Sequence, residues 1–437
     1  MIWPLNKTRP LEVKENPVGR ALFSTMPLSY TAPNKRDLAR EGYERNIIVY
    51  RAIREIVNGC ADIDIEIKQN GEVLDDQNHP ALLLLARPNP MQGFNQFIKN
   101  IFTDYLITGD MFITRYPNNS TKAPLELWSL NPLDTSVKAG KQGMPDAFIF
   151  AEKTKNEKVF RVNPIDGKSD VFHLKTYNPL DYWRGLAPLQ AAALAGDTHN
   201  IGMIWNYSLL KNGARPSGIV EFSDTPSGEV INRLKEFFKR QMQGSKNAGE
   251  IPVLTGGAKW TSVDTNPRDM DYIQTMREMA KYIASAFGVP LPLIDNDSAS
   301  YNNMEQAKER LWTDTIVPLF DEFLNAFGAW LLPVYGENLE FCANLDSIQA
   351  LEGVRTRKFE RMVKSIEKGL LTIDEARREV GFPPVGGIAE SLLVPSGLIP
   401  VELSNMDVPD DEKALAIGMY ALGYSKEEIK NALAGKD

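Results

Sequence analysis

The sequence has few of the side chains that carry most enzyme chemistry. Its 437 residues include two cysteines and three histidines. Cys60 and Cys342 lie far apart and next to no histidine at metal-ligand spacing, so neither a disulfide framework nor a zinc site is indicated and we expect buried free thiols. His79, His173 and His199 each stand alone in their segments, and we interpret them as structural.

Motifs for nucleotide binding and covalent catalysis are also missing. The string nearest to a P-loop, LTGGAKW at 254–260, has neither the spacing nor the Ser or Thr hydroxyl that a phosphate site requires. No G-x-S-x-G elbow, H-E-x-x-H helix or dinucleotide G-x-G-x-x-G is present. The sequence therefore predicts a protein that is not an enzyme, uses no cofactor and does not hydrolyse ATP itself.

Long apolar runs and an excess of positive charge are absent as well. No run of about 18 apolar residues occurs, and no basic region leads into an apolar stretch at the N-terminus. We therefore expect a protein that is made and kept in a cytoplasm, with no membrane partner. The net charge of -8 argues against tight, sequence-independent binding to DNA. It does not exclude a protein past which DNA slides without being held.

The residues that are present predict an α+β fold with two or three domains. Residues 1–34 are rich in proline and polar side chains, and we interpret them as a mobile arm. Hydrophobic periodicity then predicts a helix over 45–60, a strand over 63–67 with a hairpin turn at Asn70-Gly71, helices over 79–88 and 94–109, and strands over 111–116 and 125–130. We expect one α+β domain over the first 185 residues.

Residues 185–214 predict a helix with almost no charge. Between Leu186 and Leu210 its one formally charged side chain is Asp197. A helix that is apolar nearly all round must be buried on several sides. The polar residues 197–200 in its middle nevertheless argue against a membrane span. Packing between subunits satisfies both observations.

The next segment predicts a compact unit inserted between two helices. Pro226 begins a short helix whose face is either solvated or a docking surface. Its basic side chains are Arg233, Lys235, Lys239 and Arg240. Residues 250–264 predict a hairpin around Gly256-Gly257. A second helix follows over 268–288 and is stopped by a glycine and a proline.

A polar segment, residues 289–306, joins that helix to the next one. Asp295 and Asp297 occupy the first and third places of a calcium-loop template. The template then fails, because its later positions hold Ala299, Ser300 and Gln306. We therefore expect no metal site. The alternative interpretation is a metal-dependent enzyme acting on DNA, centred on Asp295, Asp297 and Glu305.

The C-terminal third predicts mainly helices. A long helix over 304–333 contains Pro318, which should kink it. Two shorter helices follow, and after a linker a helical pair ends the sequence. The capping-box signals in this region are Thr372 with Glu375 and Ser425 with Glu428.

Several strings together resemble the portal proteins of tailed bacteriophages, specifically the HK97-like portal family. They run in order over roughly residues 45–390 without large gaps. The strings are HPALLLLARPNP (79–90), YLITGDMFITR (105–115), DVFHLKTYNPLDYWRGLAPLQAA (170–192), LLKNGARPSGIV (209–220), NAGEIPVLTGGAKWTSVDTNPRDMDYI (247–273), ASAFGVPLPLI (284–294), NNMEQ (302–306) and KGLLTIDEARREVGFPPVGG (368–387).

The resemblance implies a ring, usually of twelve subunits, at the one capsid vertex through which DNA enters and leaves. The implied parts are a wing over 35–186, a first stem helix over 187–214, a clip over 215–267, a second stem helix over 268–290, a tunnel loop over 291–303, a long wing helix and return over 304–344, and a crown over 345–390. Residues 391–437, a helical tail, depart from the simplest family pattern.

The resemblance also implies partners and contact residues. The tunnel loop would touch passing DNA through Leu293, Ile294, Asp295, Asn296, Asp297, Ser298, Ser300, Tyr301, Asn302 and Asn303. The clip would dock partners through Arg233, Lys235, Lys239, Arg240 and Lys246. The implied partners are further copies of the chain, the terminase large subunit, a head-tail connector, the major capsid protein and double-stranded DNA bound non-specifically. The location would be the virion, after assembly in the bacterial host cytoplasm, and a prophage or gene transfer agent portal fits equally.

Overall fold

A computed structural model describes residues 34–211, 218–222, 227–236, 258–262, 269–295, 301–392 and 415–434, with short gaps inside the first, third and last ranges. The expected arm lies outside these residues apart from Asn34. The fold is α+β, as predicted, and forms two compact units. Unit 1 comprises residues 1–55, 100–120 and 127–287, and unit 2 comprises residues 56–99, 121–126 and 288–437.

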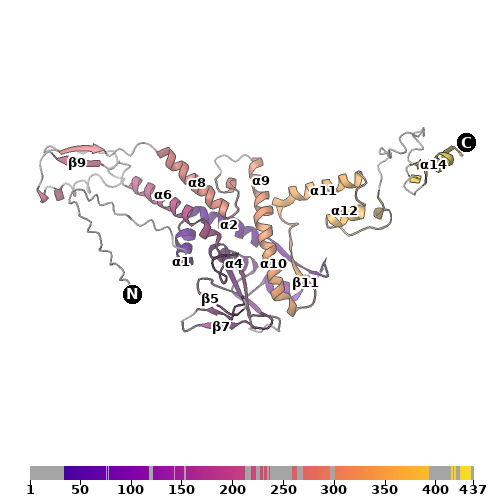
Figure 1. The fold of residues 1–437 in the computed structure, drawn as a ribbon, viewed down its shortest axis with the longest axis horizontal. Coiled ribbons are helices and arrows are strands. Elements are labelled where there is room, and N and C mark those ends of the chain that lie inside the picture. The colour runs from indigo at the N-terminus through magenta and orange to yellow at the C-terminus, as the bar shows by residue number, and fades with distance from the viewer. Residues whose placement is uncertain are drawn as a thin grey trace, which may run out of the picture. The chain divides into compact units, whose positions relative to one another are not determined.

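Two three-stranded sheets with a shared core lie in unit 1 (Figure 1). Their strand orders are β4-β3-β8 and β5-β6-β7. The strands are β3 (Asp110–Tyr116), β4 (Glu126–Leu130), β5 (Thr135–Lys138), β6 (Ala147–Phe150), β7 (Lys158–Arg161) and β8 (Val171–Lys175). Phe112 of β3 and Phe148 of β6 meet in the core with ring centroids 5.9 Å apart. Burial of such rings holds the two sheets together.

Among the helices that begin in unit 1, α2 (Ile47–Ala61) and α8 (Asp269–Ala286) correspond to the helices predicted over 45–60 and 268–288. The unit also contains α1 (Lys35–Asp37), the π-helical η1 (Leu38–Glu44), α5 (Pro188–Ala191) and α6 (Ala193–Lys211). Helix α2 buries Val49, Ala52, Ile53 and Ile56, a spacing of three and four that gives an apolar stripe. Helices α2 and α4 (Phe94–Thr108) each give residues to both units.

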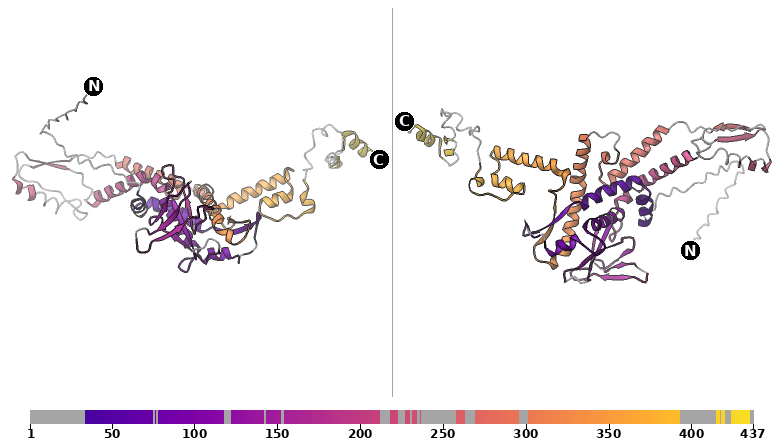
Figure 2. Two further views of the ribbon diagram at one scale, coloured as in Figure 1. Left: turned by 60° about the horizontal axis from the view of Figure 1, so that its bottom comes forward. Right: turned by 180° about the vertical axis from the view of Figure 1, so that it is seen from behind.

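The expected single helix over 187–214 is two helices. Ala192 separates α5 from α6, and its N–H donates to the carbonyls of Pro188 and Gln190 in a tight turn. Helix α6 then runs beside α8 (Figures 1 and 2). Between them in the sequence, β9 (Gly218–Phe222) pairs antiparallel with β10 (Ala258–Ser262). Strand β10 was expected in a hairpin around Gly256-Gly257, but residues 251–257 lie outside the described ones.

A sheet of order β11-β1-β2 forms in unit 2 from segments distant in the sequence. Its strands are β1 (Asp64–Gln69), β2 (Glu72–Val73) and β11 (Leu339–Asn344). The predicted turn between β1 and β2 is confirmed, with φ of 54° at Asn70 and 88° at Gly71. Strand β1 also pairs antiparallel with β11, which places Ile67 opposite Phe341. We expected one domain over the first 185 residues. Residues 56–99 instead belong to unit 2, and this pairing joins them to it.

The remaining elements of unit 2 are mostly helical. They are α3 (Pro80–Ala86), η3 (Leu291–Leu293), α9 (Tyr301–Leu311), the π-helical η4 (Trp312–Ile316), α10 (Val317–Leu331), η5 (Leu332–Val334), η6 (Gln349–Leu351), α11 (Glu352–Glu367), α12 (Ile373–Glu379), η7 (Gly387–Glu390) and α14 (Lys426–Ala434). Both predicted capping boxes are confirmed. The N–H of Glu375 donates to Thr372 Oγ1 over 3.1 Å, and that of Glu428 donates to Ser425 Oγ over 3.4 Å.

A π-helical turn accommodates Pro318 in the long helix. Proline has no N–H to donate four residues back, which disturbs an α-helix. Just before it, the N–H of Val317 donates to the carbonyl of Trp312, five residues back. One helical stretch among the described residues, Asn303–Val334, is long and apolar enough to cross a membrane by length and composition. The apolar side chains of α10 are instead buried within unit 2, as in a core helix.

Phe327 of α10 should carry much of the stability of unit 2. Its side chain is fully buried and stacks on Phe341 of β11 with ring centroids 6.0 Å apart. Phe327→Ala should lower the free energy of unfolding by about 3–5 kcal/mol through lost burial and a residual cavity. Denaturant titration checks this against Phe359→Ala, whose parent side chain is half exposed. Equal losses in the two variants would contradict this role for Phe327.

Candidate functional site: the polar loop and the apolar helix

Residues 288–295 lead into the expected tunnel loop, here called the polar loop, and are held by several hydrogen bonds and one buried side chain. Gly288 follows α8 with a φ of 69°, a left-handed conformation that favours glycine. Its carbonyl accepts a hydrogen bond of 2.7 Å from Thr315 Oγ1 in η4. The η3 turn buries Leu293, and the N–H of Asp295 donates to the carbonyl of Leu291 over 2.9 Å. The chain is thus fixed up to Asp295.

Helix α9 begins earlier than expected and shortens the loop. Tyr301, Asn302 and Asn303 were expected in the loop but are helical, because no glycine or proline interrupts the sequence from there to Leu311. Asn303 is exposed, whereas Ile294 and Asp295 are half-buried. The remaining predicted loop residues, Asn296, Asp297, Ser298 and Ser300, lie outside the described ones.

The helix that follows the loop is held by buried side chains and by one ion pair. Ala307 and Leu311 of α9 are buried. Glu309 of α9 forms an ion pair with Arg357 of α11. Residues 296–300, which lie outside the described ones, connect Asp295 to the start of α9.

Helix α6 lies in the nearly uncharged segment 185–214 and exposes several of its apolar side chains. The exposed large side chains on it are Leu194, Ile201, Met203, Ile204, Trp205 and Tyr207. The polar residues in its middle have a local role. Asn46 Nδ2 donates to the carbonyl of Gly196 over 3.2 Å and to Asn200 Oδ1 over 3.0 Å, and Asn200 Nδ2 donates to the carbonyl of Glu41. These contacts hold the first half of α6, and the exposed apolar side chains of residues 201–207 lie on more than one side of the helix.

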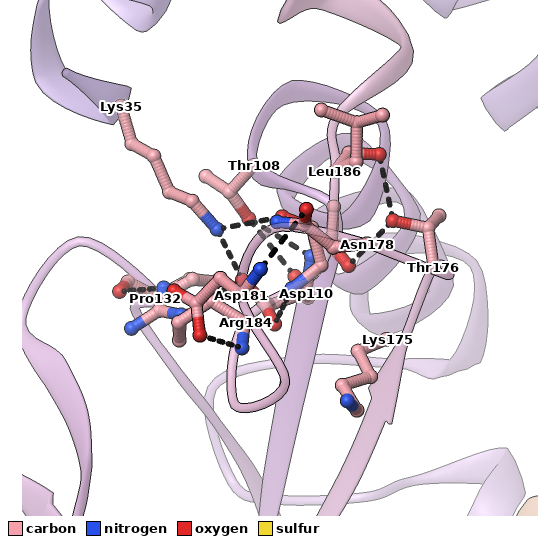
Figure 3. A network of polar contacts seen from close by, with 12 residues as sticks. Lys35, Thr108, Asp110, Pro132, Lys175, Thr176, Asn178, Asp181, Arg184 and Leu186 are labelled. Atoms are coloured by element: carbon pink, nitrogen blue, oxygen red, sulfur yellow. Dashed lines mark hydrogen bonds and ion pairs between the residues drawn. The ribbon is translucent and has the colours of Figure 1, made fainter. Parts of the chain in front are cut away.

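A buried carboxylate fixes the chain just before α5 and α6 (Figure 3). Asp110, at the start of β3, is fully buried and lies between Lys35, Arg184 and His173. Its Oδ1 accepts from the N–H of Gly185 over 2.9 Å, and its Oδ2 accepts from Arg184 Nε over 2.9 Å. Arg184 also donates to the carbonyls of Thr135 and Pro132. Every bond here is either charge-assisted or to backbone, which makes the cluster rigid.

Electrostatics keep Asp110 ionised. Burial alone would raise its pKa, but the hydrogen bond with His173 and the nearby Arg184 and Lys35 cations lower the pKa well below the ordinary aspartate value. Burial lowers the pKa of His173, against the opposing effect of Asp110, so the imidazole stays neutral near pH 7. Burial also lowers the pKa of Lys35. The cluster therefore has a single carboxylate facing two cations.

The other candidate residues are separate from one another. His79 caps α3 by accepting from the N–H of Ala81, and His199 is buried in α6. Cys60 is buried and Cys342 half-buried, and burial raises the pKa of both thiols. Within the part of the chain that the structure describes, no group of three His, Cys, Asp or Glu side chains is placed to hold a metal ion.

The basic face of the expected clip is mostly outside the described residues. Arg233 is exposed on a helical turn, 3.8 Å from Glu229. The other basic residues predicted there, Lys235, Lys239, Arg240 and Lys246, are not among the described ones.

The Asp110 cluster was not predicted from the sequence. Its members are separated by up to 150 residues, so no local pattern signals it.

Replacing Asp110 should reveal how strongly the cluster stabilises the fold. Asp110→Asn leaves two partly buried cations without their counter-charge, so the free energy of unfolding at pH 7 should fall by about 3–5 kcal/mol. The folded-state pKa of Asp110 is below its unfolded value, so this stabilisation is present above about pH 4 and is lost on further acidification. The difference between wild type and variant should therefore narrow below about pH 4.

Denaturant unfolding between pH 7 and 3 measures this difference. Asp146→Asn is the control, because the carboxylate of Asp146 is exposed and pairs with Lys138 at the surface over 2.8 Å. Such a pair contributes about 0–1 kcal/mol. A loss for Asp110→Asn no larger than for the control, or a difference unchanged in acid, would contradict the assigned role.

Comparisons with known proteins identify the family. The sequence model described as "Phage portal protein" matches residues 47–381. An uncharacterized protein of Rickettsia bellii (strain RML369-C) is 33% identical over 365 residues, 82% of this chain and 92% of that protein. The portal protein of Enterobacteria phage HK97 is 25% identical, over 78% of this chain and 79% of that protein.

A solved structure gives the same result. A chain in the neck of a native gene transfer agent particle, computed with C12 symmetry, has a TM-score of 0.59 and 29% identity to this chain. The match covers 80% of this chain and 94% of that one. The family resemblance of the sequence strings is thereby confirmed. Because the family match spans most of the sequence and both the relatives and the solved fold agree with it, this chain belongs to the phage portal protein family.

Proposed function

We propose that copies of this chain form a closed ring, of twelve subunits, that acts as the DNA channel at one vertex of a phage or phage-like particle. The observation that carries this proposal is the apolar surface of α6, which a single subunit leaves exposed. The similar chain from the gene transfer agent neck, computed with C12 symmetry, supports the subunit number. In this ring the chain is a conduit without catalysis, and the terminase supplies the energy for DNA movement.

The exposed side of α6 fits a contact between neighbouring subunits. Burying a large apolar side chain such as Leu, Ile or Met contributes about 1.5–3 kcal/mol, so the four exposed residues of this kind on α6, together with Trp205 and Tyr207, strongly favour association. A contact between two different surfaces of identical subunits generates a ring when the rotation closes. Asn200, one of the polar residues in the middle of α6, binds Glu41 of η1 and Asn46 inside the subunit, and large apolar side chains of the helix remain exposed for this contact.

The polar loop is proposed to face the bore as the tunnel loop. In a ring, Asp295 and Asp297 repeat around the channel and repel phosphate at short range, which discourages sticking. Ser298, Ser300, Asn302 and Asn303 offer weak, replaceable hydrogen bonds to the DNA backbone. The backbone hydrogen bond of Asp295 to Leu291 holds the chain where the loop begins, while DNA moves past it.

The remaining parts are assigned to partners. The clip, residues 215–267, is proposed to bind the terminase large subunit during packaging and the head-tail connector afterwards, through a basic helix that includes Arg233. The crown, residues 345–390, is proposed to lie inside the capsid, where the ring meets the major capsid protein. The ring assembles in the host cytoplasm and remains in the virion. A tailed phage, a prophage and a gene transfer agent all use such a ring, and the neighbouring genes distinguish them.

A charge on the exposed side of α6 should abolish the ring. Ile204→Asp changes a side chain that is exposed in the subunit, so the fold should lose no more than about 0.5 kcal/mol. In a ring the same carboxylate would be buried at every interface without a partner, which is strongly unfavourable. Native mass spectrometry should show rings for wild type and monomers for the variant. The control is Ile165→Asp, because Ile165 lies outside α6 and is 91% exposed; this variant should still form rings. Rings formed by Ile204→Asp would contradict the proposal.

Replacing the loop should impair DNA movement and leave assembly intact. Residues 296–300 are exchanged for five Gly and Ser residues, which removes Asp297 and leaves Asp295 and α9 unchanged. Rings of unchanged mass should form, and the yield of nuclease-protected DNA in a packaging reaction with terminase and capsid shells should fall. Loss of the ring would mean that these residues build the subunit contact, and full packaging would exclude them from the channel.

A further inference from the structure

A second apolar surface lies on the loop between β8 and α5. Its exposed side chains are Tyr177, Leu180 and Tyr182, with exposed fractions of 85%, 95% and 64%. We call these three residues the apolar tip. Leu180 has the highest exposed fraction of the large hydrophobic side chains described in the structure. Scattered exposed apolar residues are ordinary, but three within six positions of one loop require a physical explanation.

The loop that carries the apolar tip is held in a single shape by its own side chains. Asn178 Oδ1 accepts from the N–H groups of Leu180 and Asp181 over 3.0 and 3.3 Å. Asp181 Oδ1 in turn accepts from the N–H groups of Trp183 and Arg184 over 2.8 and 3.3 Å. Two consecutive turns of this kind leave the backbone little freedom.

Contacts of Tyr182 fix the loop further. Lys175 Nζ lies 4.7 Å from the centroid of the Tyr182 ring and donates to the Tyr182 carbonyl. The Tyr182 ring also meets Trp183 edge to face, with centroids 5.3 Å apart. Arg184 then joins the loop to the Asp110 cluster (Figure 3). A surface that is ordered before it binds loses little conformational entropy on binding.

We propose that the apolar tip packs against the neighbouring copy of this chain in the ring. This inference rests on the proposed ring. Each aromatic side chain buries about 150–250 Å², so three residues fall well short of the roughly 1,200–2,000 Å² of a stable specific interface. The apolar tip must therefore belong to a larger contact. Among the described helices and strands, α6 exposes the most large apolar side chains, and it lies in the same unit.

The apolar tip and the start of the apolar helices are joined by short connections. Thr176 Oγ1 donates to the carbonyl of Leu186 over 2.7 Å, and Gly185 donates to Asp110. Added bulk at Gly185 is excluded, because a Cβ there would lie 1.8 Å from the carbonyl oxygen of Gly109. The loop and the first turn of α5 are therefore one rigid piece. The apolar tip is thus held to the start of the helices whose exposed apolar side chains the proposed ring contact covers.

Site-specific crosslinking tests the identity of the neighbour. A photoreactive benzoylphenylalanine replaces Leu180 in the full chain, and purified rings are irradiated. A matched variant carries the same group at Ile165, which is also more than nine-tenths exposed. The expected result is a covalent dimer of this chain from position 180, at a yield at least fivefold above that from position 165. Leu180→Asp should reduce ring yield at least tenfold and leave the circular dichroism spectrum of the subunit unchanged.

The outcomes separate this inference from the proposed function. Equal dimer yields from positions 180 and 165, or wild-type ring yield from Leu180→Asp, would overturn the role of the apolar tip and leave the ring intact. A crosslink in assembled particles to a capsid or connector protein in place of a second copy would also overturn it. If the wild-type chain forms no ring even in particles, the proposed function itself fails.

Discussion

The carboxylate of Asp110 sets the geometry on which the functional parts of unit 1 depend. It is fully buried, and its two oxygens bind Lys35, Arg184, His173 and the backbone of Gly185. A buried charge is stable only when cations and hydrogen-bond donors surround it. The side chains of the cluster therefore have to keep one relative arrangement. That arrangement fixes the loop after β8 and the entrance to α5 and α6 at the same time.

From this fixed entrance the chain presents surfaces that one subunit cannot cover. Asn200 of α6 binds Glu41 of η1 and Asn46, and the helix leaves large apolar side chains exposed. In an isolated subunit these apolar side chains contact water, which is unfavourable in free energy. In the proposed ring, identical copies cover this surface. Folding thus buries one set of apolar side chains, and the proposed ring would bury a second set.

Local signals in the sequence predicted much of this fold. The hairpin at Asn70-Gly71 and the capping box at Thr372 depend on residues a few positions apart, and both form as expected. The pairing of β1 with β11 and the Asp110 cluster join residues far apart in the chain, where no periodicity relates them. The start of α9 at Tyr301 was missed because a polar composition suits a helix end as well as a loop. The wing, stem, clip and crown assignments came from the family resemblance and stay proposals.

Electron microscopy of the purified full-length assembly tests the central claim most directly. The account predicts a closed ring of twelve subunits with a central bore. In that ring α6 lies at each subunit boundary and residues 296–300 line the narrowest part of the bore. A closed ring in which α6 faces solvent, or in which these residues lie on the outer surface, would contradict the account even if the subunit number were correct.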